Sequence, residues 1–336
     1  MRCRVSTTTV GDRVVHHLHD DEAGSSASIL PSYGFNLFDL RLPIGGEVRP
    51  VVACEPGWVE APSRPARNGF PILFPFPGRI GNARYTFDGK SYDLVPNKPP
   101  HAIHGFALDA PWDVVEHKVH PHGATIVGRF QISRNAPAAV GRWPSDALLE
   151  VTYTLAGGIL AMASRVENVG EGRLPWGLGI HSYFRLPFDR GGDFDRTRVQ
   201  IPASRCWVLE NGLPTGETRS VSGSPMDYRA GRPMAGLMAD DALTDLGRST
   251  EGLASCDLTD FGLDAHLRLV LDRSTREVVV FTPPDTPGVV AVEPYTQMAD
   301  AFALAEKGID AGLQVLEPGQ ESPALMMIVR AATGDG

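Results

Sequence analysis

The stretch LLEVTYTLAGGILAMASRVENVG, residues 148–170, consists of two runs of β-branched and alternating apolar and polar residues around Ala156-Gly157-Gly158. A period of two is typical of strands that bury one face. The small residues between the runs favour a tight hairpin turn. The stretch therefore predicts two antiparallel strands, at residues 148–157 and 159–170.

Short strands are predicted along much of the remaining chain, at residues 124–133, 276–284, 288–294 and 324–332. The 36 glycines and 28 prolines suit short strands that are joined by many turns. Residues 296–308 are the best helical candidate, and residues 135–146 and 189–195 are predicted to be long loops. Strands do not alternate with long helices, which argues against Rossmann and TIM architectures. We expect one all-β domain over residues 1–336.

The net charge, the apolar runs and the cysteines indicate which partners and which compartment to expect for this protein. The net charge of −9 argues against a nucleic-acid partner. No apolar run reaches the length of about 18 residues that a membrane helix needs, and the first residues lack the apolar core of a secretory signal. The four cysteines are far apart in sequence, and we expect reduced thiols in a cytoplasmic protein: Cys3, Cys54, Cys206 and Cys256.

The segment from Phe70 to Phe106 carries the first group of polar candidates. Arg79 follows an apolar run, and Asn97 and His104 lie at loop-like positions; a surface ion pair and a turn are the alternatives for Arg79 and Asn97. His101 and His104 form an HAIH motif, but the prolines before it favour extended or turn backbone. Residues i and i+3 of a strand point to opposite faces, so no metal site is predicted.

Two further candidates lie in apolar surroundings. His181 lies in the middle of LPWGLGIHSYFRLP, residues 174–187, where a buried imidazole bonded to a backbone carbonyl is the alternative interpretation. Glu293 follows the apolar run VVAV, and Pro294 is expected to end that strand's pairing. A strand-end carboxylate can be held rigidly and still face a cleft; a plain surface acid is the alternative.

Together these segments resemble the aldose 1-epimerase (galactose mutarotase) family. The resemblance covers residues 71–330 and rests on GRIGNARYTFDGKSYDLVPN followed by AIHGF, on HSYFRLP, on VVAVEP and on LQVLEPGQ. It implies a large antiparallel β-sandwich, called a supersandwich, with an open sugar-binding cleft.

The resemblance also implies roles for single residues. Glu293 matches the catalytic base and His181 the acid toward the ring oxygen, with His104 hydrogen-bonding nearby. The predicted sugar-binding residues are Arg79, Asp257 and Asn97, with Asp260 and Asp264 as alternatives to Asp257. Ring opening requires an acid and a base but no redox step, so neither a cofactor nor a metal is expected.

The chain departs from the best-studied galactose mutarotases at three motifs. Gly105-Phe106 replaces a double glycine, Pro294-Tyr295 replaces Thr-Gln, and Arg185 replaces an asparagine. These differences resemble the divergent bacterial and hexose-6-phosphate branch, for which Arg64, Arg67 and Arg185 are candidate phosphate ligands. A non-catalytic sugar-binding protein and a polysaccharide lyase or hydrolase are two competing hypotheses for the function. The sugar and the oligomeric state are left open.

Overall fold

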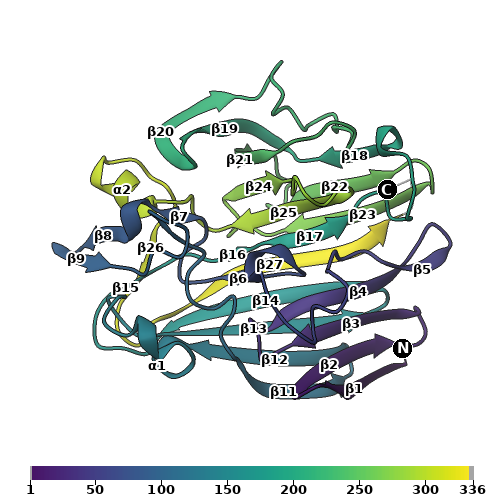
Figure 1. Cartoon of the computed structure of the whole chain (residues 1–336), viewed down its shortest axis with the longest axis horizontal. Coiled ribbons are helices and arrows are strands. Elements are labelled where there is room, and N and C mark those ends of the chain that lie inside the picture. Colours follow the sequence, from purple (N-terminus) through teal and green to yellow (C-terminus); the bar gives the residue numbers. More distant parts are fainter. Residues whose placement is uncertain (1, 333–336) are drawn as a thin grey trace.

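The computed structural model describes residues 2–332, which form 27 strands and two short α-helices, α1 (Ile132–Asn135) and α2 (Ala301–Glu306). Figure 1 shows stacked sheets with the helices at the periphery. No helix in this part of the chain has the length and apolar character that crossing a membrane requires.

The first large sheet has eight strands in the order β11 (Asp113–His120), β12 (Gly123–Gln131), β13 (Ala147–Ala156), β14 (Ile159–Asn168), β27 (Glu321–Ala332), β23 (Ala265–Leu271), β22 (Ala254–Asp260) and β18 (Thr197–Gln200). The second large sheet has the order β20 (Leu213–Ser220), β19 (Ala203–Glu210), β21 (Asp240–Leu246), β24 (Glu277–Phe281), β25 (Val289–Tyr295), β16 (Gly179–Ile180) and β6 (Ile72–Leu73), and β17 (Ser182–Arg185) also pairs with β25.

A five-stranded sheet follows chain order: β1 (Cys3–Val10), β2 (Arg13–Asp20), β3 (Ser25–Leu30), β4 (Asn36–Ile44) and β5 (Glu47–Pro50). The remaining strands form three pairs: β7 (Arg79–Ile80) with β10 (Ala102–Ile103), β8 (Arg84–Phe87) with β9 (Lys90–Asp93), and β15 (Leu174–Trp176) with β26 (Gln314–Leu316). The named strands all pair antiparallel, which confirms the predicted all-β class.

The hairpin predicted from residues 148–170 is confirmed as β13 and β14. Ala156 pairs with Ile159, and Gly157 and Gly158 between them have φ values of 58° and 72°. Two left-handed residues form the turn whose twist matches that of the flanking strands. Every second residue of β13 is buried, so this hairpin supplies one wall of the core.

The core lies between the sheets. Val278 and Val280 of β24 share one buried cluster with Leu267 and Leu269 of β23, which joins the two large sheets. The five-stranded sheet packs on the other half of the first large sheet, where the ring of Phe35 stacks on that of Tyr153 at 5.6 Å. The predicted antiparallel β-sandwich is therefore confirmed (Figure 1).

The helix predicted over residues 296–308 is much shorter, because α2 begins only at Ala301. The preceding residues bond to other segments: Thr296 N donates to Leu178 O, and Met298 N donates to Ala311 O. These backbone groups are already paired across the fold, so tertiary hydrogen bonds override the helical pattern.

Candidate active site

The register of the second large sheet places His181 opposite Glu293. Ser182 of β17 pairs with Val292, and Gly179 of β16 pairs with Tyr295. His181 lies between these two pairs, in the break between β16 and β17. Its Nε2 is 3.3 Å from Oε1 of Glu293. Because side chains alternate along a strand, both residues lie on the face of β25 opposite the core.

The position of Glu293 corrects one sequence-based expectation. Pro294 does not end the strand, because β25 continues to Tyr295 and Pro294 pairs with Val278. On the other side of β25 the ladder is interrupted at Ile180 and His181. A proline lacks an N–H, so it is tolerated where no ladder bond is required. Glu293 is thus held inside a strand rather than at its end.

Two tyrosines hold the pair in place. The Tyr295 hydroxyl donates to Oε2 of Glu293 at 2.6 Å. Gly179 lies opposite Tyr295, and a Cβ there would stand 2.5 Å from Cδ1 of Tyr295, so glycine makes room for the ring. The ring of Tyr183 stacks on that of His181 at 4.5 Å, and its hydroxyl lies 3.3 Å from Nε2 of His181. The proton-carrying groups are therefore packed rigidly.

His104 completes the group from a loop. Its ring lies 5.5 Å from the ring of His181, edge to face. The residue has a φ of 66°, which is unusual for a side chain with a Cβ and typical of strained functional positions. Gly78 N donates to its Nδ1 at 3.3 Å. Nδ1 is thus an acceptor, which places the proton of the neutral ring on Nε2 as a donor.

Burial governs the charges of this group. Glu293, His181 and His104 are 1%, 6% and 8% exposed. Burial raises the pKa of Glu293 well above its usual value, the Tyr295 hydrogen bond opposes this rise, and the charge of Asp240 adds to it. Burial, with contributions from His104 and Arg67, lowers the pKa of His181 well below its usual value. Burial, helped by Arg79, lowers the pKa of His104 to about 3.

Arg79 and Asn97 support the loop of His104 in different ways. Arg79 lies near His104, on whose pKa its charge acts, and its Nη1 donates to Gly212 O at 3.1 Å. Asn97 bonds both backbone groups of Ile103, accepting from N at 2.8 Å and donating to O at 3.0 Å. The polar atoms of Asn97 are thus occupied in fixing the loop. His101 accepts separately from a backbone N–H at 3.0 Å.

The structure does not bring Asp257 to this group. Asp257 lies on β22 of the first large sheet, and its carboxylate pairs with Nε of Arg268 at 2.7 Å. The alternative Asp260 accepts from the backbone N–H groups of Phe188 and Gly262. The CDLTDF segment therefore belongs to the first large sheet, whereas Glu293 lies in the second.

Asp240, which was not among the residues predicted from the sequence, lies near enough to Glu293 for its charge to act there. It is the first residue of β21, is exposed, and pairs with Phe281, whose ring faces His181 edge-on at 6.0 Å. Its charge contributes to raising the pKa values of Glu293 and Tyr295. The sequence around it, MADDALTDL, contains no motif that distinguishes it from other surface acids.

The three candidate phosphate ligands do not converge. Arg185 donates to the carbonyl oxygens of Val52 and Cys54, each at 3.2 Å. It lines a groove of about 640 Å³ beside the five-stranded sheet, and His104 and His181 are not among the residues that line this groove. Arg64 and Arg67 instead both pair with Asp285, and Arg67 also lies near enough to His181 for its charge to act there.

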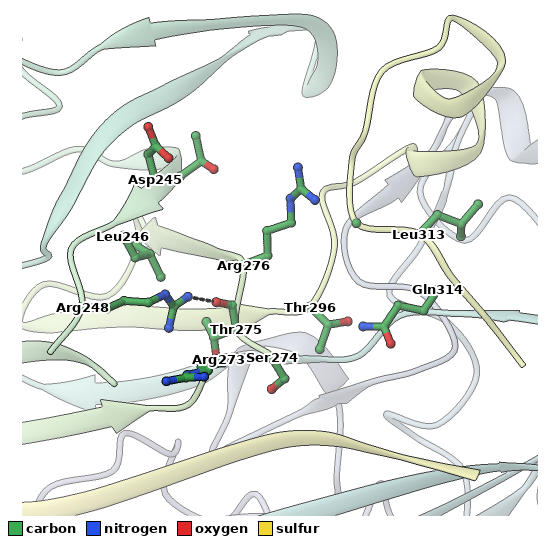
Figure 2. A pocket seen from close by; sticks show the side chains of 12 residues that line it. Asp245, Leu246, Arg248, Arg273, Ser274, Thr275, Arg276, Thr296, Leu313 and Gln314 are labelled. Carbon is green, nitrogen blue, oxygen red and sulfur yellow. Dashed lines mark hydrogen bonds between the residues drawn. The ribbon is translucent and has the colours of Figure 1, made fainter. Parts of the chain in front are cut away.

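A second groove, of about 590 Å³, opens beside the N-terminal end of β24 (Figure 2). Figure 2 shows Arg248, Arg273 and Arg276 around it, with Arg248 bonded to Thr275. His104, His181 and Glu293 are not among its lining residues. The groove is therefore separate from the candidate active site.

Comparisons with known proteins agree with this fold and residue pattern. The family model for aldose 1-epimerase matches residues 19–328. Galactose mutarotase of Homo sapiens is 31% identical over 152 residues, which is 45% of this chain and 42% of that protein. The uncharacterized protein YphB of Escherichia coli is 25% identical over 173 residues, 49% of this chain and 51% of that protein. The chain therefore spans about half the length, or less, of these relatives.

Solved structures show the same architecture. A galactose mutarotase-like protein from Clostridium acetobutylicum has a TM-score of 0.88 and 19% identity, with 98% of both chains covered. An aldose epimerase homologue from C. elegans has a TM-score of 0.75 and 20% identity, covering 93% of this chain and 97% of that one. At such identities the likeness shows the fold alone. Because the family model covers most of the residues, this chain belongs to the aldose 1-epimerase family.

Proposed function

We propose that this protein interconverts the α and β anomers of a cyclic aldose by general acid–base catalysis. The observation that carries the proposal is the 3.3 Å separation between Nε2 of His181 and Oε1 of Glu293. Ring opening takes a proton from the C1 hydroxyl and gives one to the ring oxygen. Both oxygens are bonded to C1, so the base and the acid must lie side by side, as these two groups do.

The step balances without a cofactor. Glu293 takes the proton of the C1 hydroxyl, the O–H electron pair becomes the carbonyl bond, and the bond from C1 to the ring oxygen breaks. His181 supplies the proton that the ring oxygen needs. After rotation about the C1–C2 bond, the reverse transfers close the ring from the other face of the carbonyl. Each group must therefore act as both acid and base.

The shifts in the pKa values of Glu293 and His181 indicate which of the two groups holds their shared proton in the free protein. Burial raises the pKa of Glu293 and lowers that of His181, which favours the form in which Glu293 holds the shared proton and His181 is neutral. The working form moves this proton to His181 across their contact. The pair titrates as a unit, and the raised pKa of Glu293 means that the pair keeps its last proton to higher pH than an ordinary carboxyl group would.

Other residues bind the sugar and stabilise charge. His104 stays neutral at physiological pH, because its pKa is about 3, and it donates from Nε2 to the ring oxygen or a neighbouring hydroxyl. Arg79 and Asp240 make charge-assisted hydrogen bonds to the other hydroxyls. Asp240 takes the role that the sequence resemblance placed on Asp257.

Tyr295→Phe is expected to move the alkaline limb of the kcat/KM profile to higher pH by about one to two units. The hydroxyl stabilises the Glu293 carboxylate, and a hydrogen bond to a charged group contributes about 1.5–3 kcal/mol. Without it the pKa of Glu293 rises further, so the pair keeps its last proton to higher pH. The plateau falls about 10- to 100-fold, because the working form becomes less populated.

Tyr153→Phe is the matched control for this change. Tyr153 is equally buried, but its hydroxyl has no hydrogen-bond partner among residues 2–332. Its removal should leave both limbs of the pH profile in place. An unshifted alkaline limb in Tyr295→Phe would show that the hydroxyl does not tune Glu293.

Asp240→Asn is expected to raise KM for an aldose about 10- to 100-fold, with a smaller change in kcat. The charge-assisted hydrogen bond that is lost stabilises the bound substrate and the transition state to the same extent. Its removal therefore raises KM and leaves kcat almost unchanged. Asp257→Asn is the control, because that carboxylate pairs with Arg268. A larger KM effect from Asp257→Asn than from Asp240→Asn would restore the original assignment.

Polarimetry over a panel of free and phosphorylated aldoses tests the function directly. Accelerated approach to anomeric equilibrium supports the proposal and identifies the preferred sugar. A protein that binds an aldose by calorimetry without accelerating its mutarotation would instead be a non-catalytic sugar-binding protein.

A further inference from the structure

One carboxylate joins two arginines beside the candidate active site. Nη2 of Arg64 lies 2.8 Å from Oδ2 of Asp285, and Nη2 of Arg67 donates to Oδ1. The arginines lie at the 3-10 turn formed by residues 65–67, whereas Asp285 lies between β24 and β25. We call this group of three residues the Asp285 bridge. It connects segments that are more than 200 positions apart in the sequence.

Arg67 is the member of the bridge that faces the reacting pair. Its guanidinium carbon lies 6.0 Å from the centre of the Phe281 ring, which in turn lies 6.0 Å from the ring of His181. The Arg67 side chain is 22% exposed, so most of it is covered. Tyr183 donates its hydroxyl to Ala66 O at 2.7 Å, which ties the same turn to the site.

The charges around the bridge balance. Arg64 also pairs with Glu55 at 3.1 Å, so two arginines face the two carboxylates of Asp285 and Glu55. The hydrogen bond from Arg64, with the charge of Arg67, lowers the pKa of Asp285 to about 2, so this carboxylate is ionised at any working pH. Two unpaired arginines would suit a phosphate, whose geometry the guanidinium matches. Here a phosphate would have to displace a carboxylate already in that position.

We infer that Asp285 is a specificity-determining residue, which together with Glu55 neutralises Arg64 and Arg67 and so directs the site to uncharged aldoses and against aldose phosphates. The inference rests on the proposed function and names its substrate class. With C1 of the sugar at the His181–Glu293 pair, Arg67 is a cationic side chain near the bound sugar, because Arg67 and His181 both lie 6.0 Å from the Phe281 ring. The hexose-6-phosphate hypothesis assigned these arginines to a phosphate group of the substrate. In the structure the carboxylate of Asp285 already pairs with both of them.

The test is the ratio of kcat/KM for glucose 6-phosphate to that for glucose, measured by polarimetry at one ionic strength. Asp285→Asn removes the charge and keeps the shape, and it should raise the ratio about 10- to 100-fold, because it frees the guanidinium of Arg67 and leaves Arg64 only its pair with Glu55. Adding Arg67→Gln to this variant should return the ratio toward the parental value. Asp285→Ser is a second charge-removing variant, in case the asparagine disturbs folding.

Asp227→Asn is the matched control. Asp227 also pairs with an arginine, Arg229, at 2.7 Å and has a pKa lowered to about 2 by that arginine, and its loss removes the same net charge. Its ratio should stay parental. An equal rise in Asp227→Asn, or no rise in either folded Asp285 variant, overturns the inference.

The experiment also distinguishes an error in the proposed function from an error in the role of Asp285. If the parental protein accelerates no anomer interconversion, catalysis is disproved, but calorimetry with glucose and glucose 6-phosphate still measures selectivity. Asp285→Asn should then bind glucose 6-phosphate about tenfold or more tightly than the parental protein does. Unchanged affinity overturns the role of Asp285 without reference to turnover.

Discussion

Replacing Glu293 with glutamine is expected to lower kcat about 100- to 10,000-fold while KM changes little. The amide keeps the shape of the side chain but cannot take the C1 proton, and general acid–base catalysis typically contributes this factor. Proton transfer is a transition-state interaction, so the loss should appear in kcat. Polarimetry over a range of aldose concentrations separates the two constants.

The variant should remain fully folded. The unfolded carboxyl loses its proton near its ordinary pKa, whereas burial raises the pKa of the folded one. Stability is therefore lost as the pH rises from the unfolded value through the folded value, and glutamine avoids this loss. A thermal melt at neutral pH should show an unchanged or higher Tm. A well-folded Glu293→Gln protein that keeps the parental rate would falsify the assignment, and Asp240 would be the next base to examine.

His181→Asn is expected to lower kcat by a similar factor, again about 100- to 10,000-fold. Asparagine keeps a polar group opposite Glu293 but has no imidazole to carry the proton to the ring oxygen. The native ring packs face to face on Tyr183, so the smaller side chain also leaves space. A melt of the variant is needed, and kcat should be compared below its transition temperature.

The double variant distinguishes a coupled pair from two independent contributions. If Glu293 and His181 exchange one proton, removing either partner already disables the step. The combined loss in kcat should then be much smaller than the product of the two single losses. Losses that multiply would mean that the two residues act in separate steps.

The sequence predicted much of the framework because its signals are local. The alternation in residues 148–170 and the paired glycines specify a hairpin before any tertiary contact forms. Asp88-Gly89 is likewise a local signal, because an Asp-Gly pair favours a two-residue hairpin turn, and both residues adopt positive φ between β8 and β9. Local patterns failed where other segments competed for the backbone. The helix at residues 296–308 is shortened for this reason, since Thr296 and Met298 bond across the fold.

The candidate site was predictable only in part. The resemblance selected His104, His181 and Glu293, and the structure brings these three side chains together. It gave no signal for Asp240 or Tyr295, because a lone acid and a strand tyrosine look like many others. It selected Asp257, which lies on the other large sheet from Glu293, because short acidic motifs such as CDLTDF and MADDALTDL do not reveal which sheet their strands join.

The sequence by itself determined the strands, their turns and the residue types available for proton transfer. Those properties depend on neighbours along the chain, through side-chain alternation and turn geometry. Only the tertiary structure decided which groups meet: the register that sets His181 opposite Glu293, the burial that shifts their pKa values, and the carboxylate of Asp285 between Arg64 and Arg67. These contacts join residues more than 100 positions apart, and electrostatic and desolvation energies depend on distance in space rather than along the chain.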